Sequence, residues 1–278
     1  MFCAAAMALV ALIPAACKRA APESSAPAIE FLTDSFDLDD IGWMTEQADE
    51  SGVDLNVIGL CAIDKDVAIL FGGVRVAAGT IRSFLLRTSD GGKSWHEVML
   101  PVLGSELTHV AFSNRQHGWA LAQWAVEGPG TILLFRSTDG GKTWRQLTDI
   151  QGSQGHAVPD GSPLSMTFTS VLNGEIELAY NSESTSIDDT RLEIETLASD
   201  DGGVTWSMVR RETRKWPPVE PLAEHHDRGF DNTDWELDTR AAGEPIVIRR
   251  FDREQSQWRV MTLPTHFQYQ RGRVLGPP

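Results

Sequence analysis

The sequence predicts an all-β protein built from repeated four-stranded antiparallel sheets, and three observations support this class. One phrase recurs as RTSDGGKSW at 87–95, RSTDGGKTW at 136–144 and ASDDGGVTW at 198–206. Extended apolar runs flank each copy, and an Asp-Gly turn between two such runs is the strongest short-range signal of a β-hairpin. The tryptophans that end the copies, with a fourth at Trp258, recur near the spacing of about 40 to 50 residues typical of four-stranded repeats.

Each residue type in the repeated phrase has a physical role in a tight turn. Glycine tolerates the positive φ that such a turn needs. The aspartate and the Ser or Thr hydroxyls can bond to backbone N–H groups of the turn. The tryptophan follows the turn onto the next strand, where its large apolar face can pack between neighbouring sheets. The residues that carry the pattern are Thr88, Asp90, Gly92, Ser94, Trp95, Ser137, Asp139, Gly141, Thr143, Trp144, Ser199, Asp201, Gly203, Thr205 and Trp206.

This S/T-x-D-x-G-x-T/S-W pattern resembles the Asp-box, or bacterial neuraminidase repeat. The resemblance implies a structural turn that joins the third and fourth strands of a β-propeller blade on the outer rim, away from the central site. In addition, HGWALA at 117–122 is similar to the second strand of blades in photosystem II stability/assembly factor-like proteins. The implied fold is a small β-propeller of four-stranded antiparallel blades, four to five in number, similar also to sialidase-like propellers.

The propeller is expected to cover residues 29–278. Its fourth turn has lost both glycines, and Asp252 stands one position early relative to Trp258. The tails at 29–54 and 264–278 are candidates for a further blade that closes the ring. The four expected blades cover 55–100, 107–150, 163–212 and 229–263.

The N-terminus resembles the signal of a bacterial lipoprotein. Residues 1–17 are apolar and Ala-rich, and the run is shorter than the roughly 20 residues that span a bilayer. Cys17 follows Pro14-Ala15-Ala16 as in a lipobox, although Leu is more typical than Pro14 and no basic residue precedes the apolar run. The resemblance implies a lipidated Cys17, a flexible tether at 18–28 and a periplasm-facing envelope protein, on the outer membrane in a Gram-negative cell. A plainly cleaved signal and a short membrane anchor are the alternatives.

Composition restricts the partners. A net charge of −15 argues against nucleic acid, whose phosphates need clustered Lys and Arg, and against anionic lipid surfaces, so a membrane contact would depend on the lipid anchor alone.

Cys61 is the only cysteine after residue 17 and sits in an apolar run, which predicts a buried strand residue. The adjacent His225 and His226 would point to opposite sides of a strand. We expect no metal and no cofactor.

The sequence contains few of the residues that the sialidase reaction requires. Sialidases use three arginines around the substrate carboxylate, a Tyr nucleophile paired with a Glu, and an Asp acid/base. The sequence has no Arg-Ile-Pro motif, and its only tyrosines are Tyr180, which reads as a strand residue, and Tyr269 near the end. The GGKS and GGKT stretches also lack the upstream Gly of a phosphate-binding loop. These observations predict no catalytic residues and a protein that is not an enzyme.

Two functions remain open from the sequence. The first is a non-enzymatic envelope propeller that binds an unknown partner protein or glycan, as an assembly or stability factor does. Its contacts would come from loops between blades, with Trp124, Trp216 and Trp235 as candidates because Trp is enriched in binding hot spots. The second is a glycan-acting hydrolase of the sialidase type, which three arginines around a tyrosine at the ring centre would support.

Overall fold

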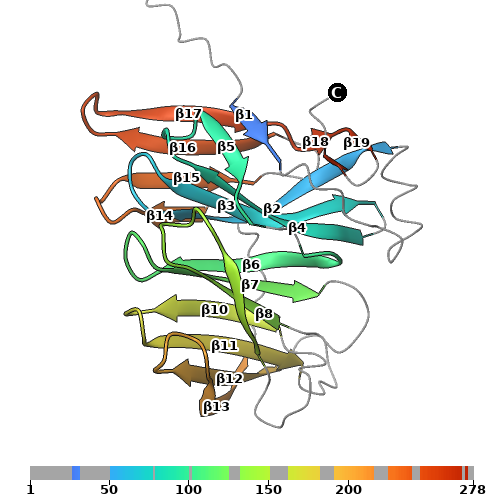
Figure 1. Ribbon diagram of the computed structural model, residues 1–278, viewed down its shortest axis with the longest axis vertical. Helices are drawn as coiled ribbons and strands as arrows, with labels where there is room; N and C mark the ends of the chain where they lie inside the picture. Colours follow the sequence, from blue (N-terminus) through green and yellow to red (C-terminus); the bar gives the residue numbers. More distant parts are fainter. Residues whose placement is uncertain are drawn as a thin grey trace, which may run out of the picture.

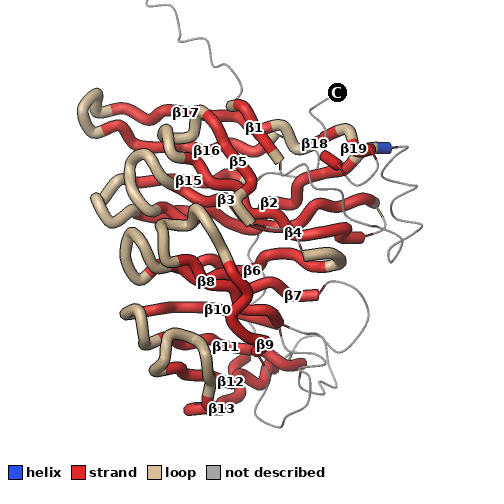
Figure 2. Tube along the Cα trace, viewed as in Figure 1, coloured by secondary structure: helices blue, strands red, loops and turns tan. Residues whose placement is uncertain are grey.

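The protein is described by a computed structural model in which strands and tight turns predominate (Figures 1 and 2). The residues described are 27–31, 51–77, 79–99, 102–124, 132–150, 162–181, 191–215, 225–239, 245–270 and 273–274. Within these ranges no helix has the length and apolar character needed to cross a bilayer.

The predicted fold class is confirmed: four sheets of four consecutive antiparallel strands form the blades of a small β-propeller. Blade 1 contains β2 (Val53–Ala62), β3 (Ala68–Val76), β4 (Gly79–Thr88) and β5 (Ser94–Glu97). Blade 2 contains β6 (Ser105–Phe112), β7 (Gly118–Trp124), β8 (Ile132–Ser137) and β9 (Arg145–Ile150). Blade 3 contains β10 (Ser162–Phe168), β11 (Gly174–Asn181), β12 (Arg191–Ser199) and β13 (Ser207–Lys215). Blade 4 contains β14 (His225–Arg228), β15 (Asp234–Asp238), β16 (Ile246–Asp252) and β17 (Gln257–Leu263).

Parts of both tails join blade 1. Strand β1 (Ala28–Glu30) runs parallel beside β5, and β18 (His266–Phe267) pairs antiparallel with β2, so this sheet has six strands. A short hairpin of β19 (Tyr269–Gln270) and β20 (Arg273–Val274) follows. The described parts of the tails therefore extend the first blade and do not form the separate closing blade that the sequence suggested. Residues 32–50 of that expected blade lie outside the described ranges.

The blades stack in the order 4, 1, 2, 3 from top to bottom of Figure 1. Their first strands β14, β2, β6 and β10 contact one another in this order on the inner side. Their fourth strands β17, β5, β9 and β13 lie on the outer side, where β1 adds to β5. Blades 4 and 3 stand at opposite ends of the stack (Figure 1). The described strands thus form an open arc, and the closed ring expected from the repeat is interrupted between blades 3 and 4.

Apolar side chains fill each space between neighbouring blades. Trp235 of blade 4 is fully buried together with Leu70 of blade 1, and Trp119 of blade 2 with Ile176 of blade 3. A third cluster, which includes Ile69 and Phe135, fills the space between blades 1 and 2. Because burial of apolar surface contributes about 25 cal/mol per Å², these three interfaces are the main source of stability for the stack.

The repeated phrase forms the same hairpin turn three times, and we call each of these turns a corner. In the first, the Asp90 carboxylate accepts bonds from the backbone N–H groups of Lys93 (2.9 Å) and Ser94 (3.0 Å) and from the Ser94 hydroxyl (2.6 Å). The Thr88 hydroxyl donates to Asp90 (2.8 Å) and accepts from the Gly92 N–H (2.9 Å). The corners at 137–144 and 199–206 repeat these bonds. As predicted, the corners lie between the third and fourth strands on the outer rim.

Hydrogen bonding also controls the charge of the corner aspartates. Partial burial by itself would raise the pKa of Asp90, but the bonds from Ser94, Thr88 and Lys93 outweigh it and hold the pKa at about 2. The bonds from Thr205 are the main cause that brings the pKa of Asp201 to about 2. Both carboxylates are therefore ionised at neutral pH and act as fixed acceptors in the turn.

Each corner packs against the face of the preceding blade, and we call that face a seat. A Cβ on Gly92 would lie 2.1 Å from Met261 Sδ of blade 4, and one on Gly203 would lie 2.8 Å from Leu134 Cδ2 of blade 2. Glycine is therefore required at these positions for close approach as well as for positive φ. The corner of blade 2 meets Ile69 of blade 1 in the same way, through Gly141.

A pair of facing residues on the second and third strands characterises each occupied seat. The pairs are Ile69–Arg87 in blade 1, Trp119–Arg136 in blade 2 and Trp235–Arg250 in blade 4. Both tryptophans, Arg87 and Arg250 bond to backbone carbonyls of the next blade. Arg87 Nε donates to the Gly140 carbonyl (2.9 Å), Trp119 Nε1 to the Gly202 carbonyl (2.9 Å), and Trp235 Nε1 to the Asp64 carbonyl (3.1 Å).

Candidate functional site

The corresponding face of blade 3 has no corner against it and a different composition. At the register positions of Trp119–Arg136, blade 3 has Glu175 facing Ala198. One rung further along, where blade 2 has the apolar pair Leu121–Leu134, blade 3 has Glu177 facing Thr196. Where each of the other three blades pairs an apolar residue with an arginine, blade 3 thus pairs a glutamate with an alanine, and we call this face of blade 3 the open face.

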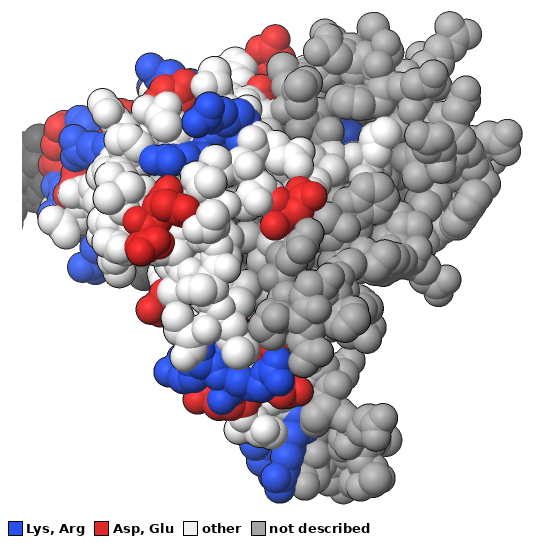
Figure 3. Space-filling view, turned by 60° about the horizontal axis from the view of Figure 1, so that its bottom comes forward, with Lys and Arg blue, Asp and Glu red and all other residues white. Residues whose placement is uncertain are grey.

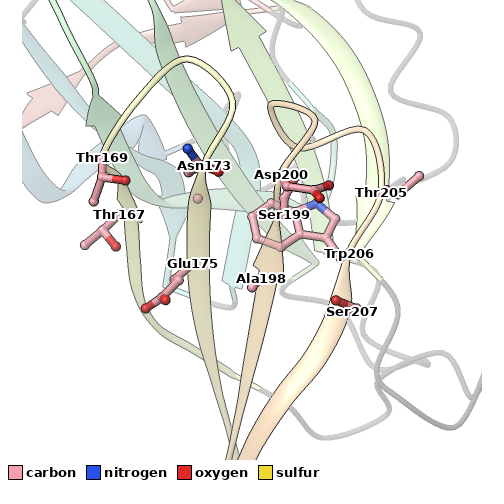
Figure 4. A pocket seen from close by; sticks show the side chains of 11 residues that line it. Thr167, Thr169, Asn173, Glu175, Ala198, Ser199, Asp200, Thr205, Trp206 and Ser207 are labelled. Atoms are coloured by element: carbon pink, nitrogen blue, oxygen red, sulfur yellow. The ribbon is translucent and has the colours of Figure 1, made fainter.

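A pocket of about 440 Å³ occupies the position of the missing corner on the open face (Figure 4). Glu175, Ala198 and Ser207 belong to its sheet, and Thr167 and Thr169 lie on the opposite side from Trp206. Asp200, at the start of the third corner, lies beside the indole of Trp206 in Figure 4. The pocket thus has one aromatic wall, two carboxylates and several hydroxyl groups.

The aromatic wall is held in place from behind. The ring of Trp206 packs edge-on against Phe168, with ring centroids 6.0 Å apart, and its Nε1 donates to the Gly203 carbonyl at 3.0 Å. Since Phe168 is buried at the end of β10 and Gly203 belongs to the corner, the fold orients the indole before any ligand arrives. A fixed aromatic ring loses little conformational entropy on binding.

A polar network continues along the open face beyond the pocket. Glu177 accepts bonds from Ser165 Oγ, Arg210 Nη2 and Arg214 Nη2, each at 3.3 Å. Arg214 also bonds to Glu212 at 2.6 Å. Basic and acidic side chains lie side by side near the lower end of the molecule in Figure 3, the end at which blade 3 stands. The charged side chains of the open face are therefore paired with one another and remain accessible to solvent.

This combination is suited to a polyhydroxylated ligand. The C–H faces of a sugar ring are apolar and can stack on an indole, while its hydroxyls can donate to carboxylates and accept from hydroxyl groups. Glycoside-cleaving sites also commonly use two carboxyl groups, one as acid and one as base or nucleophile. Glu175 and Asp200 are the two carboxylates that line this pocket.

Tyr180 does not lie in an arrangement of the sialidase type. Its hydroxyl donates to Glu195 at 3.2 Å, and Arg211 also bonds to Glu195. Strand alternation puts Arg210 and Arg214 on the other face of the sheet, so the described residues place one arginine and not three near this tyrosine. Burial, and then the charge of Glu195, raise the pKa of Tyr180, which disfavours its use as a nucleophile.

One candidate binding residue from the sequence is corrected by the structure. Trp235 is 0% exposed because it forms part of the seat of blade 4, so its side chain is closed to a partner. Trp124 ends β7, and its side chain lies outside the described part, as do Trp216 and the lipidation candidate Cys17. Cys61 is buried on β2 as expected, and burial raises the pKa of its thiol.

Sequence reasoning missed Glu175 and Asp200 as site residues, although a signal was present. In GEIELAYN at 174–181 the glutamates alternate with apolar residues, while the aligned strand GWALAQW at 118–124 is apolar on that face. A second strand with glutamates at the seat positions indicates a blade face that no neighbour covers.

Comparisons with known proteins agree with this architecture. The BNR/Asp-box repeat model matches residues 135–146. A search among curated proteins finds no significant match. The GH74 xyloglucanase from Xanthomonas campestris is 16% identical with a TM-score of 0.33, and the match covers 72% of this chain but only 28% of that enzyme.

Two further solved structures cover more of both chains. An α-L-arabinanase from Penicillium chrysogenum complexed with arabinobiose is 11% identical over 78% of this chain and 72% of its own, with a TM-score of 0.36. A family 117 glycoside hydrolase produced by the marine bacterium Zobellia galactanivorans is 10% identical over 87% and 75%, with a TM-score of 0.35. Likenesses of this size assign no residue of this chain a role.

The prediction that the chain is not an enzyme is contradicted by these comparisons, since the structures found carry the names of glycoside-cleaving enzymes. The prediction of the repeat itself is confirmed by the family model and by the same hydrogen bonds in all three corners. The chain is a β-propeller with a BNR/Asp-box repeat at residues 135–146, and the same turn connects the third and fourth strands within blades 1, 2 and 3.

Proposed function

We propose that the chain is a glycan-acting hydrolase that takes a sugar residue into the pocket on blade 3. One observation carries the proposal: the fixed indole of Trp206 and the carboxylates of Glu175 and Asp200 line the same open pocket. The indole would stack on the face of one sugar ring. The carboxylates would bond to its hydroxyls and supply the acid and base groups for cleavage of the adjacent glycosidic bond.

The names of the similar structures supply substrates for a first test, namely arabinan, arabinobiose and xyloglucan. The purified chain would be incubated with each polymer and assayed for new reducing ends. Binding would be followed in parallel by titration calorimetry. We expect Glu175→Gln and Asp200→Asn each to lower turnover by at least 100-fold, because each removes one of the two ionisable groups. Binding should weaken by only about tenfold, as for the loss of one charged hydrogen bond.

Glu254→Gln is the matched control, because Glu254 is an exposed carboxylate on the turn of blade 4, far from the pocket. It should leave turnover and binding unchanged. Turnover that survives both pocket substitutions would place the reaction elsewhere on the chain. If neither binding nor cleavage is found with any of these glycans or with a broad glycan array, the proposed function is wrong.

A further inference from the structure

The gap between blades 3 and 4 coincides with losses on both of its sides. Blade 3 has Glu175 and Ala198 in place of the apolar residue and arginine that form a seat. Blade 4 has no glycine in its turn, which reads Asp252 to Trp258 as DREQSQW. These are the two partners that would meet if the ring closed, and the other three junctions retain both the seat and the glycines.

The blade 4 turn has the properties of a turn that no neighbour touches. Trp258 is 39% exposed, whereas Trp95 in the first corner is fully buried and Trp144 and Trp206 in the other two are partly buried. Ser256 has φ 51°, so the turn still contains a residue in the left-handed conformation, but this residue is a serine and not a glycine. Glycine is needed where a corner packs closely on its seat, so a turn that has no seat does not require it.

We infer that the junction between blades 3 and 4 is a built opening, and that an internal stretch of a neutral polysaccharide lies along the open face with one residue in the pocket. The inference rests on the proposed function and deepens it by naming the kind of substrate. The pocket lies at one end of the open face, and β12 runs on from Ala198 to Leu192 for six residues, about 20 Å at ~3.3 Å per residue. Polar side chains continue over that length, so further sugar residues would find bonding groups outside the pocket.

Charge favours a neutral chain. The carboxylates of Glu175, Glu177, Asp200 and Glu212 outnumber the guanidinium groups of Arg210 and Arg214 on this side of the sheet, and both arginines are already paired with glutamates. The whole chain adds a net charge of −15. A polyuronate or a nucleic acid would be repelled, whereas hydroxyl groups can bond to both members of each ion pair.

The test is a series of linear α-1,5-arabino-oligosaccharides of two, four, six and eight units, titrated into the full-length protein at low and high salt. We expect affinity to rise at least tenfold from two to six units and to change little with salt. Polygalacturonate, an acidic polymer of similar length, should bind more weakly. A double variant, Glu212→Ala with Arg214→Ala, removes groups beyond the pocket and should weaken the longer ligands about tenfold while leaving the disaccharide unchanged.

Arg253→Ala with Glu254→Ala, on the exposed turn of blade 4, is the matched control for the loss of one positive and one negative charge. Equal affinity at every length, or stronger binding of polygalacturonate that salt abolishes, overturns the inference but leaves the pocket in place. No binding to any glycan instead removes the proposed function itself. Thermal unfolding of each variant identifies loss of binding that comes from misfolding.

The opening can also be measured without a ligand. Spin labels on Glu212→Cys in blade 3 and Thr262→Cys in blade 4 report the distance across the gap. Cys61 is too buried to take a label, and Cys3 and Cys17 are replaced by serine. We expect a long distance that matches the separation of the end blades in Figure 1. A short distance of the kind found between adjacent blades would mean that the ring closes in solution, and the inference would fail.

Discussion

Asp200 and Asp201 are adjacent carboxylates with different surroundings. Asp201 accepts bonds from Ser199, from the backbone of Val204 and from both the backbone and hydroxyl of Thr205, while Asp200 faces the pocket. A single step along the chain therefore separates a residue that holds the turn from one that is available to a ligand. This pair allows structural and functional effects of the same chemical change to be compared at one place.

Asp201→Asn should destabilise the protein by about 1 kcal/mol, since the amide keeps the shape of the carboxylate but accepts fewer and weaker bonds, and solvent replaces part of the loss. Asp200→Asn should leave stability within about 0.5 kcal/mol of the parent, as for most surface substitutions. Urea unfolding of the two variants measures the difference. Equal destabilisation by both would contradict the role given to the corner carboxylate.

The corner aspartates also predict how stability depends on pH. The pKa values of Asp90 and Asp201 are about 2 in the folded protein, below the ordinary value of 3.8. A carboxylate with a lowered pKa stabilises the fold above its unfolded pKa, and this contribution disappears as pH falls through the folded value. Stability should therefore decline between about pH 4 and pH 2. Unfolding of Asp201→Asn across this window should show a shallower decline, and an unchanged slope would exclude the aspartate as a cause.

At the scale of elements, the corner and the seat are complementary parts of one contact. The corner contributes two glycines without side chains, and the seat contributes an apolar residue with an arginine beside it in blades 1, 2 and 4. Packing of the corner on the seat acts together with the buried apolar clusters that join neighbouring blades. Loss of either part at a junction should loosen that junction.

Gly203→Ala tests this coupling. The new Cβ would approach Leu134 Cδ2 to 2.8 Å, and the residue has φ 94°, which L side chains rarely adopt. We expect a loss of about 2 kcal/mol from strain and overpacking together. Ser256→Gly in the unseated turn of blade 4 is the control, because glycine relieves its left-handed conformation and should raise or preserve stability. A harmless Gly203→Ala would show that the seat does not press on the corner.

Those elements whose sequence signal lies within a few neighbouring residues could be predicted from the sequence. The Asp-Gly turns located three hairpins, and the spacing of Trp258 located a fourth whose glycines were gone. The opening and the pocket depend on which blades meet, and that depends on long-range packing. Trp235 shows the difficulty, since the same residue type serves in a seat here and would serve in a binding surface elsewhere.

At the scale of the whole molecule, the open face of blade 3 lies at one end of the open arc, and blade 4 forms the other end. The N-terminal strand β1 is fixed to the outer edge of blade 1, on the side of the stack away from blade 3 (Figure 1). If Cys17 carries a lipid as its sequence context suggests, only the segment between Cys17 and Ala28 separates the membrane from that edge. The open face of blade 3 would then point away from the membrane toward polymers in the surrounding space.

Cys17→Ser tests the anchor. We expect the parent chain, expressed with its native N-terminus in a bacterial host, to incorporate labelled palmitate and to sediment with membranes, since several acyl chains hold a protein stably. The variant should take up no label and appear in the soluble periplasmic fraction or remain unprocessed. Label that persists in the variant, or a parent chain found entirely in the soluble fraction, would show that the N-terminus is a different kind of signal.

The pairing of β18 with β2 affects the order of events during synthesis. Val53 is opposite Phe267, and the ring of Phe267 meets Phe31 edge-on at a centroid distance of 5.5 Å. Blade 1 is translated first, yet one of its edges has no partner until the last part of the chain has left the ribosome. That bare edge is exposed to chaperones and to aggregation for as long as the other three blades take to emerge. A ribosome stalled shortly before codon 267 should therefore hold a nascent chain whose first blade is still incomplete.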